Sequence, residues 1–151
     1  PKQKGTAAET ACLRFAQAHG FPLAERLTLS GQHDRGDLML VPGPEVIVEV
    51  KAGKQAQYAS RAQIEAWLSE TETERINATA SVGLLVTQPR GIGNSRVELW
   101  NAWFVRGGDI ANCPADTFIF NYPISILYSH ALLMLRTAGW GTEITHGDAD
   151  E

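Results

Sequence analysis

Two short apolar segments on either side of a proline–glycine cluster constrain the fold of this chain most strongly. The segments span residues 37–41 and 46–50, and the cluster between them is Pro42-Gly43-Pro44. Both segments are rich in β-branched or long aliphatic residues, and such a cluster between two apolar segments indicates a turn. The sequence therefore predicts a β-hairpin.

Charged residues mark the open end of this hairpin. Asp37 opens the first strand, and the second strand ends in Glu49-Val50-Lys51. Residues two apart in a strand share a face, so Glu49 and Lys51 point the same way, while Val48 and Val50 point toward a core. Asp37 lies opposite the far end of the second strand. The hairpin therefore brings two carboxylates together with an ammonium group beside them.

These residue types are suited to metal-assisted cleavage of a phosphodiester. Mg²⁺ takes oxygen ligands at about 2.0–2.1 Å, and the predicted ligands are Asp37, Glu49 and the backbone carbonyl of Val50. The ion would polarise a phosphoryl oxygen and lower the pKa of a bound water. Lys51 would orient that water or stabilise the developing negative charge.

Each of these residues also has an ordinary structural interpretation. An Asp before a strand is most often a turn residue, and Glu-x-Lys at a strand end is most often a solvated ion pair. Glu9 follows Thr6 at capping-box spacing, which predicts a helix that begins at Thr6 with Glu9 as cap partner. The functional alternative is that Glu9 reaches the Asp37–Glu49 site from this helix.

The second half of the chain is predicted to have a structural role. Ser60 and Gln63 repeat the capping-box spacing and predict a helix to about residue 78, whose solvated side carries Glu70, Glu72 and Glu74. Strands are predicted for residues 82–87, 97–105 and 116–122. A last apolar helix, either buried or part of a dimer contact, is predicted to begin at Pro123 and run to Gly139.

Several motifs together resemble a known superfamily. The order Gly5-Thr6-x-x-Glu9, Gly20-Phe21, Ala24-Glu25-Arg26, Asp34-Arg35-Gly36-Asp37 and Glu49-Val50-Lys51 resembles the PD-(D/E)XK nucleases. Within them it is similar to the archaeal and phage Holliday-junction resolvases, over roughly residues 5–87. The resemblance implies an α/β, restriction-endonuclease-like fold with a central mixed β-sheet flanked by helices. It also implies an active site of Glu9, Asp37, Glu49 and Lys51. Gly36 stands where the superfamily name has proline.

The resemblance further implies an activity and partners. It points to a Mg²⁺- or Mn²⁺-dependent endodeoxyribonuclease of recombination that cuts four-way DNA junctions as a homodimer and leaves a 5′-phosphate, as in phage. Gln63 becomes a possible accessory residue, because some members carry a glutamine on the helix after the lysine. Two alternatives stay open: a nuclease of the same superfamily acting on duplex DNA or DNA ends, restriction-like or RecB-like, and an inactive DNA-binding module.

The charge distribution leaves room for a basic DNA-binding face. The net charge is -4, yet residues 1–61 carry eight Lys/Arg against six Asp/Glu, and residues 62–151 carry five against eleven. A nuclease can combine an acidic total with a basic face. Lys2, Lys4 and Arg61 are more simply explained as solvated charges. The predicted DNA-binding residues are Arg26, His33, Arg35, Lys54 and Arg90.

Composition excludes several other classes. A chain of 151 residues has the typical length of one domain, so a single nuclease domain is predicted, with residues 141–151 as an acidic tail. No apolar run approaches the ~20 residues of a membrane helix, and no signal-peptide pattern is present. Cys12 and Cys113 read as buried thiols of a cytoplasmic protein of a bacterial, archaeal or phage-infected cell. The glycine-containing loop at residues 88–95 lacks a Walker lysine, which excludes a nucleotide cofactor.

Overall fold

A mixed six-stranded sheet forms the centre of the computed structural model, which describes residues 2–28, 36–105 and 124–142. The strands follow one another across the sheet in the order of the sequence. They are β1 (Glu25–Arg26), β2 (Leu38–Val41), β3 (Val46–Lys51), β4 (Val82–Thr87), β5 (Asn101–Val105) and β6 (Ile126–Leu127). Only β3 and β4 pair in parallel, and the other neighbours are antiparallel.

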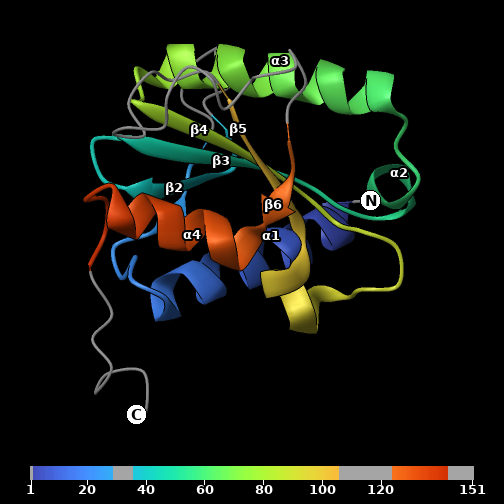
Figure 1. Ribbon diagram of the computed structural model, residues 1–151, viewed down its shortest axis with the longest axis horizontal. Helices are drawn as coiled ribbons and strands as arrows, with labels where there is room; N and C mark the ends of the chain where they lie inside the picture. The colour runs from blue at the N-terminus through green and yellow to red at the C-terminus, as the bar shows by residue number, and fades with distance from the viewer. Residues whose placement is uncertain (1, 29–35, 106–123, 143–151) are drawn as a thin grey trace.

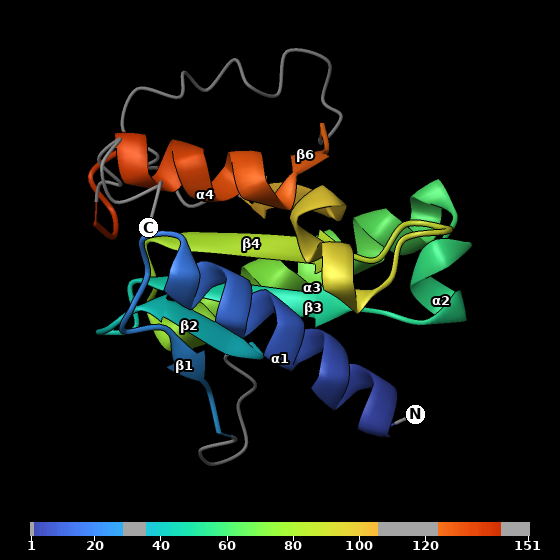
Figure 2. The same cartoon turned by 90° about the horizontal axis from the view of Figure 1, so that it is seen from below.

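Helices cover both faces of this sheet (Figures 1 and 2). α1 (Lys2–Ala18) and α4 (Tyr128–Thr137) lie on one face, and α3 (Arg61–Ala78) lies along the other. The short α2 (Lys54–Gln57) and the 3-10 helix η1 (Asn94–Leu99) occur in the connections after β3 and β4. The predicted α/β class, with a mixed sheet between helices, is confirmed.

The predicted hairpin is formed by β2 and β3. Leu38 pairs with Val48 and Met39 with Ile47, and the turn occupies the Pro-Gly-Pro cluster and Glu45. Val48 belongs to the core beneath α1 and α4, with Val50 packed against that core. Ile47 packs against residues of α3, on the opposite face. The alternation places Glu49 and Lys51 on the α3 side, as the two-residue period predicts.

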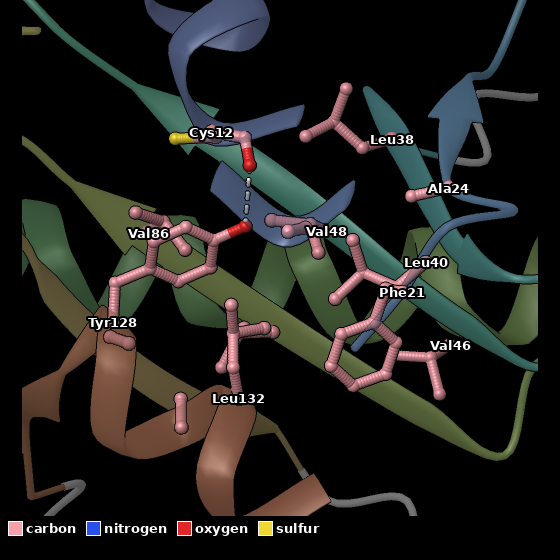
Figure 3. Close-up of a cluster of buried hydrophobic side chains, with 14 of the residues drawn as sticks. Cys12, Phe21, Ala24, Leu38, Leu40, Val46, Val48, Val86, Tyr128 and Leu132 are labelled. Carbon is pink, nitrogen blue, oxygen red and sulfur yellow. Dashed lines mark hydrogen bonds between the residues drawn. The ribbon is translucent and has the colours of Figure 1, made fainter. Parts of the chain in front are cut away.

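The larger core lies between the sheet and the α1–α4 face. Figure 3 shows Phe21, Val48 and Leu132 in this cluster, and each of them is buried. At its centre the hydroxyl of Tyr128 donates a hydrogen bond of 2.9 Å to the backbone carbonyl of Cys12, so that α4 is tied to α1. Cys12 is a buried free thiol, as predicted.

Local signals located α3 correctly and α1 only in part. The side chain of Ser60 accepts a hydrogen bond from the backbone N–H of Gln63, and α3 ends at Ala78, both as predicted. The start of α1 was wrong, because the helix begins at Lys2 and Thr6 lies inside it. The carbonyl of Thr6 accepts a hydrogen bond from the hydroxyl of Thr10, as in a helix interior. Glu9 is therefore not a capping-box partner.

Two predicted elements of the second half have different bounds. The strand predicted for residues 97–105 is split into η1 and β5, because only residues from Asn101 onward pair with β4. Trp100, which lies between the two elements, is fully buried. The last helix begins at Tyr128, because Ile126 and Leu127 pair with β5 first. Pro123, Cys113, the strand predicted for residues 116–122 and the predicted tail beyond residue 142 lie outside the described residues. None of the helices in the described ranges has the length and apolar character needed to span a bilayer.

We expect Tyr128→Phe to destabilise the protein, because it removes the buried hydrogen bond to the Cys12 carbonyl. A hydrogen bond of this kind contributes about 1 kcal/mol, which lowers the Tm of a domain of this size by about 2–4 °C. Thermal unfolding followed by circular dichroism measures the change. Tyr58→Phe is the matched control, since Tyr58 is largely exposed. Equal Tm values for the two variants would contradict the structural role of the hydroxyl.

Candidate active site

Asp37 is held at the end of the hairpin by backbone groups of β3 and of Leu27, the residue after β1. Its backbone N–H donates to the carbonyl of Val48 at 3.0 Å, and its own carbonyl accepts from Leu27 at 2.9 Å. Its carboxylate accepts a hydrogen bond of 2.8 Å from the N–H of Val50. The carboxylate therefore accepts the hydrogen bond of a β3 backbone N–H, and this bond fixes the carboxylate beside β3.

Gly36 allows this approach. It has a φ of +99°, a value that proline cannot adopt because its ring fixes φ near about −65°. A Cβ atom at this position would lie 3.3 Å from the carbonyl oxygen of Val48. The local backbone therefore favours glycine at this position.

Glu49 is the centre of a row of carboxyl groups. Its side chain is buried on the α3 face of β3, close enough to Asp37, directly before β2, and to Glu74 of α3 for both to raise its pKa. Asp37 in turn lies close enough to Glu9 of α1 to raise the pKa of Glu9. The side chains of Glu9, Asp37, Glu49 and Glu74 therefore follow one another in a row, which we call the carboxylate row.

The helix α3 supplies two glutamates that were predicted to be solvated. Glu70 is exposed as predicted, but Glu74 is buried, with 1% of its surface exposed. Trp67, Thr71, Glu74 and Ala78 are the buried residues of α3, so Glu74 lies on the face that packs on the sheet. The three- and four-residue spacing of these residues is the sequence signal that identifies Glu74 as buried. Glu72 is half-buried and forms an ion pair with Arg75.

Lys51 lies beside the row, on the same face of β3 as Glu49. Its Nζ atom is 3.3 Å from Oε1 of Glu70 and 3.9 Å from Oε2 of Glu49. The ammonium group also lies 5.7 Å from the ring centroid of Trp67. Burial lowers the pKa of Lys51, but the charges of Glu49 and Glu70 outweigh it and raise the pKa above its ordinary value. Lys51 is therefore a cation at neutral pH.

Glu9 faces the row from α1 and is fixed by Arg26 of β1. Nη1 of Arg26 donates a hydrogen bond of 3.0 Å to Oε2 of Glu9. The same guanidinium donates to the carbonyl of Thr6 and to the hydroxyl of Thr10. The guanidinium of Arg26 is thus engaged with α1, and its predicted contact with DNA stays a prediction.

Burial and like charge raise the pKa of Glu49 and of Glu9. Burial is the largest cause for Glu49, and the hydrogen bonds and charges of Asp37 and Glu74 add to it. Burial and Asp37 also raise the pKa of Glu9, while Arg26 lowers it. Neighbouring carboxylates cannot all ionise in a low-dielectric site unless a positive charge joins them.

The donor set fits a divalent cation. Ligand oxygens of Glu49, Glu70 and Glu74 all lie within 4.8 Å of one another, so this group could hold a metal ion. Carboxylate oxygens are the ligands that hard cations such as Mg²⁺, Mn²⁺ and Ca²⁺ prefer. With Glu9 and Asp37 the site contains five carboxyl groups. Within the described residues, Lys51 lies near Glu49 and Glu70, and Arg26 pairs with Glu9. A divalent cation would compensate this excess of negative charge.

The other predicted site residues lie in different positions. Lys54 and Arg90 are exposed, on α2 and on the loop after β4, and His33 and Arg35 lie outside the described residues. Gln63 lies two helical turns before Glu70, which is about 11 Å along the helix axis. The N–H of Val50 is bound to Asp37, and the metal contact of its carbonyl stays a prediction.

Comparison with family models, with curated proteins and with solved structures gave no significant match to this chain. The case for a function therefore depends on the geometry of the site itself.

We expect Glu74→Gln to raise the stability of the metal-free protein, because an amide replaces an ionisable group in the buried row. The Tm should rise by about 2–4 °C, the shift that 1 kcal/mol produces in a domain of this size. A ligand that binds the folded state alone raises the Tm, so Mn²⁺ should stabilise the wild type more than the variant. Differential scanning fluorimetry measures both effects.

Glu65→Gln is the control for Glu74→Gln, since Glu65 is an exposed residue of the same helix. It should leave the metal-free Tm and the shift with Mn²⁺ unchanged. A Glu74→Gln protein that is less stable than the wild type without metal, or that keeps the full shift with Mn²⁺, would contradict a cation site in the row.

Proposed function

We propose that this protein is a metal-dependent endodeoxyribonuclease of the PD-(D/E)XK type. The observation that supports this most directly is the meeting of Asp37, Glu49 and Lys51 at one end of the β2–β3 hairpin, with carboxyl groups of α1 and α3 on either side. Stability does not require such a group, because buried and clustered charges are costly. A reaction on a charged substrate would explain why these charged groups are clustered.

The carboxylates would hold the cation and so define where the cleaved phosphate lies. Glu49 is common to both sets of proposed ligands: it lies beside Asp37, directly before β2, and it shares the metal-compatible group with Glu70 and Glu74 of α3. When bound, a cation such as Mg²⁺ supplies charge neutralisation at the phosphate and acidifies a water molecule. The hydrogen bond from Val50 keeps Asp37 oriented before any cation binds.

Lys51 would act as a fixed positive charge. Its raised pKa makes it a poor proton acceptor at neutral pH, so electrostatic stabilisation of the negative charge that develops on the phosphate is its role. Glu70 and Glu49 hold the ammonium group at the edge of the carboxylate row. A phosphate oxygen that enters the site replaces part of this ion-pairing.

We predict that Lys51→Ala and Asp37→Asn lower the rate constant of DNA cleavage by at least about 10²–10³, the loss expected when a preorganised electrostatic contact is removed. Both proteins should fold. In Asp37→Asn the oxygen of the new amide can still accept the hydrogen bond from the N–H of Val50, and Lys51 is partly exposed. Single-turnover cleavage of labelled DNA with Mg²⁺ measures the rate constant, and electrophoretic mobility shift measures binding.

Arg14→Ala is the control for the loss of a positive charge, since Arg14 is an exposed residue of α1. It should cleave at the wild-type rate. Equal activities of the wild type, Lys51→Ala and Asp37→Asn would contradict the nuclease proposal. DNA binding without any cleavage in all proteins would favour the alternative of an inactive DNA-binding module.

The substrate that we propose is a four-way DNA junction, on the grounds of the motif order in residues 5–51. We predict faster cleavage of a labelled junction than of a linear duplex of equal length, with paired, symmetric cuts by a homodimer. Denaturing gel analysis with Mg²⁺, and with Ca²⁺ as a cation that fills oxygen sites without strict octahedral geometry, measures this preference. Equal cleavage of junction, duplex and free ends would instead identify a restriction-like or RecB-like nuclease.

A further inference from the structure

An exposed aromatic ring and a guanidinium group meet next to the end of β3. Tyr58 follows α2 directly, and it is the only aromatic residue among the exposed large apolar residues of the described ranges, with 67% of its surface accessible. The guanidinium carbon of Arg90 lies 5.3 Å from the centroid of its ring. Solvent exposure of a large ring has no stabilising role of its own, so this pair invites a functional explanation.

The two partners of the pair are held in place by Gln88. The Oε1 atom of Gln88 accepts a hydrogen bond of 2.9 Å from the N–H of Gly53, directly before α2. Its Nε2 atom donates to the carbonyl of Ile92 at 3.0 Å, and so closes the loop that carries Arg90. On the inner side of α2, Ala56 packs in one cluster with Trp67. The ring and the guanidinium therefore belong to a preorganised surface.

This surface has the charge of an anion-binding region in an otherwise acidic chain. Residues 52–64 and 88–93 contain Lys54, Arg61 and Arg90 and none of the chain's 17 acidic residues. Arg61 is paired with Glu65 of α3. Lys54 and Arg90 are exposed, and neither forms an ion pair with another residue in the described part of the chain. Arg90 thus contacts the exposed ring, and Lys54 precedes Tyr58 by four residues.

The surface adjoins the carboxylate row through the backbone of β3. The N–H of Gln88 donates to the carbonyl of Lys51 at 2.9 Å, and α2 begins three residues after Lys51. Trp67 links the two regions on the inner side, since it contacts Ala56 of α2 and lies beneath the ammonium group of Lys51. The Tyr58–Arg90 pair and Lys51 are therefore joined through the end of β3 and through Trp67.

We propose that Lys54, Tyr58 and Arg90, which we call the Tyr58 surface, bind an unpaired nucleotide of the DNA substrate, with its base stacked on the Tyr58–Arg90 pair. Aromatic rings and guanidinium planes stack on bases that are splayed out of a helix, and cations beside them contact the phosphates. Bases within a duplex are already stacked on each other. The inference rests on the proposed nuclease function and adds that a nucleotide beside the cleaved bond is unpaired when the DNA is bound.

The test compares binding to two DNAs of equal duplex length, one blunt and one with a single-stranded thymidine overhang. Fluorescence anisotropy of the labelled DNA with the intact protein in Ca²⁺ gives the Kd for each. The wild type should bind the overhang DNA more tightly. Tyr58→Ala should weaken this binding about tenfold, as expected for the loss of one base–aromatic stack, and should leave the Kd for blunt DNA unchanged.

Two conservative variants separate stacking from charge and from folding. Tyr58→Phe keeps the ring and should bind the overhang DNA within about twofold of the wild type, because stacking does not need the hydroxyl. Arg90→Lys keeps the charge but lacks the planar group, so it should weaken overhang binding more than blunt binding. The proposal is overturned if Tyr58→Ala binds the overhang DNA like the wild type, or if it weakens both DNAs equally.

This result is independent of the cleavage assay. Arg14→Ala should bind both DNAs like the wild type, because Arg14 is an exposed residue of α1 outside the Tyr58 surface. A tenfold effect of Tyr58→Ala without any cleavage by the wild type would refute the nuclease function and retain the binding site. Cleavage abolished by Lys51→Ala, with no effect of Tyr58→Ala on overhang binding, would refute the Tyr58 surface alone.

Discussion

The burial of Glu49 between Asp37 and Glu74 is the interaction on which the rest of this site depends. A carboxylate in the protein interior loses its hydration, and two further acids beside it add repulsion, so the arrangement is unfavourable without positive charge nearby. The fold supplies part of that charge through Lys51, at the edge of the row. In the proposed function, a bound cation supplies the rest of the positive charge. The same cation would bind the phosphate of the substrate, so the costly cluster of acids would serve the reaction.

Local signals in the sequence accounted for the centre of the fold. The Pro-Gly-Pro cluster predicted the hairpin, and the two-residue period of β3 placed Glu49 and Lys51 on one face. Ser60 marked the start of α3, and the structure ends this helix at the predicted residue. These features depend on a few adjacent residues, so a single sequence contains the information that they need.

Features that depend on packing were harder to predict. Glutamate is usually solvated, and only the spacing of Trp67, Thr71, Glu74 and Ala78 indicates that Glu74 faces the sheet. The start of α1 was placed too late, because Thr6 and Glu9 match a capping box inside a longer helix. Residues 97–105 are largely apolar, and only pairing with β4 and β6 decides which of them form a strand.

The helical position of Glu70 and Glu74 has a consequence for how this chain can vary in length. Each residue of an α-helix turns the residues after it by about 100°, so one residue added between Ser60 and Glu70 would rotate both glutamates away from Glu49 while the helix itself persisted. An addition before Ser60 would change only the connection from α2. Descendants of this sequence can therefore gain residues directly before Ser60, whereas the interval from Ser60 to Glu74 must keep its length.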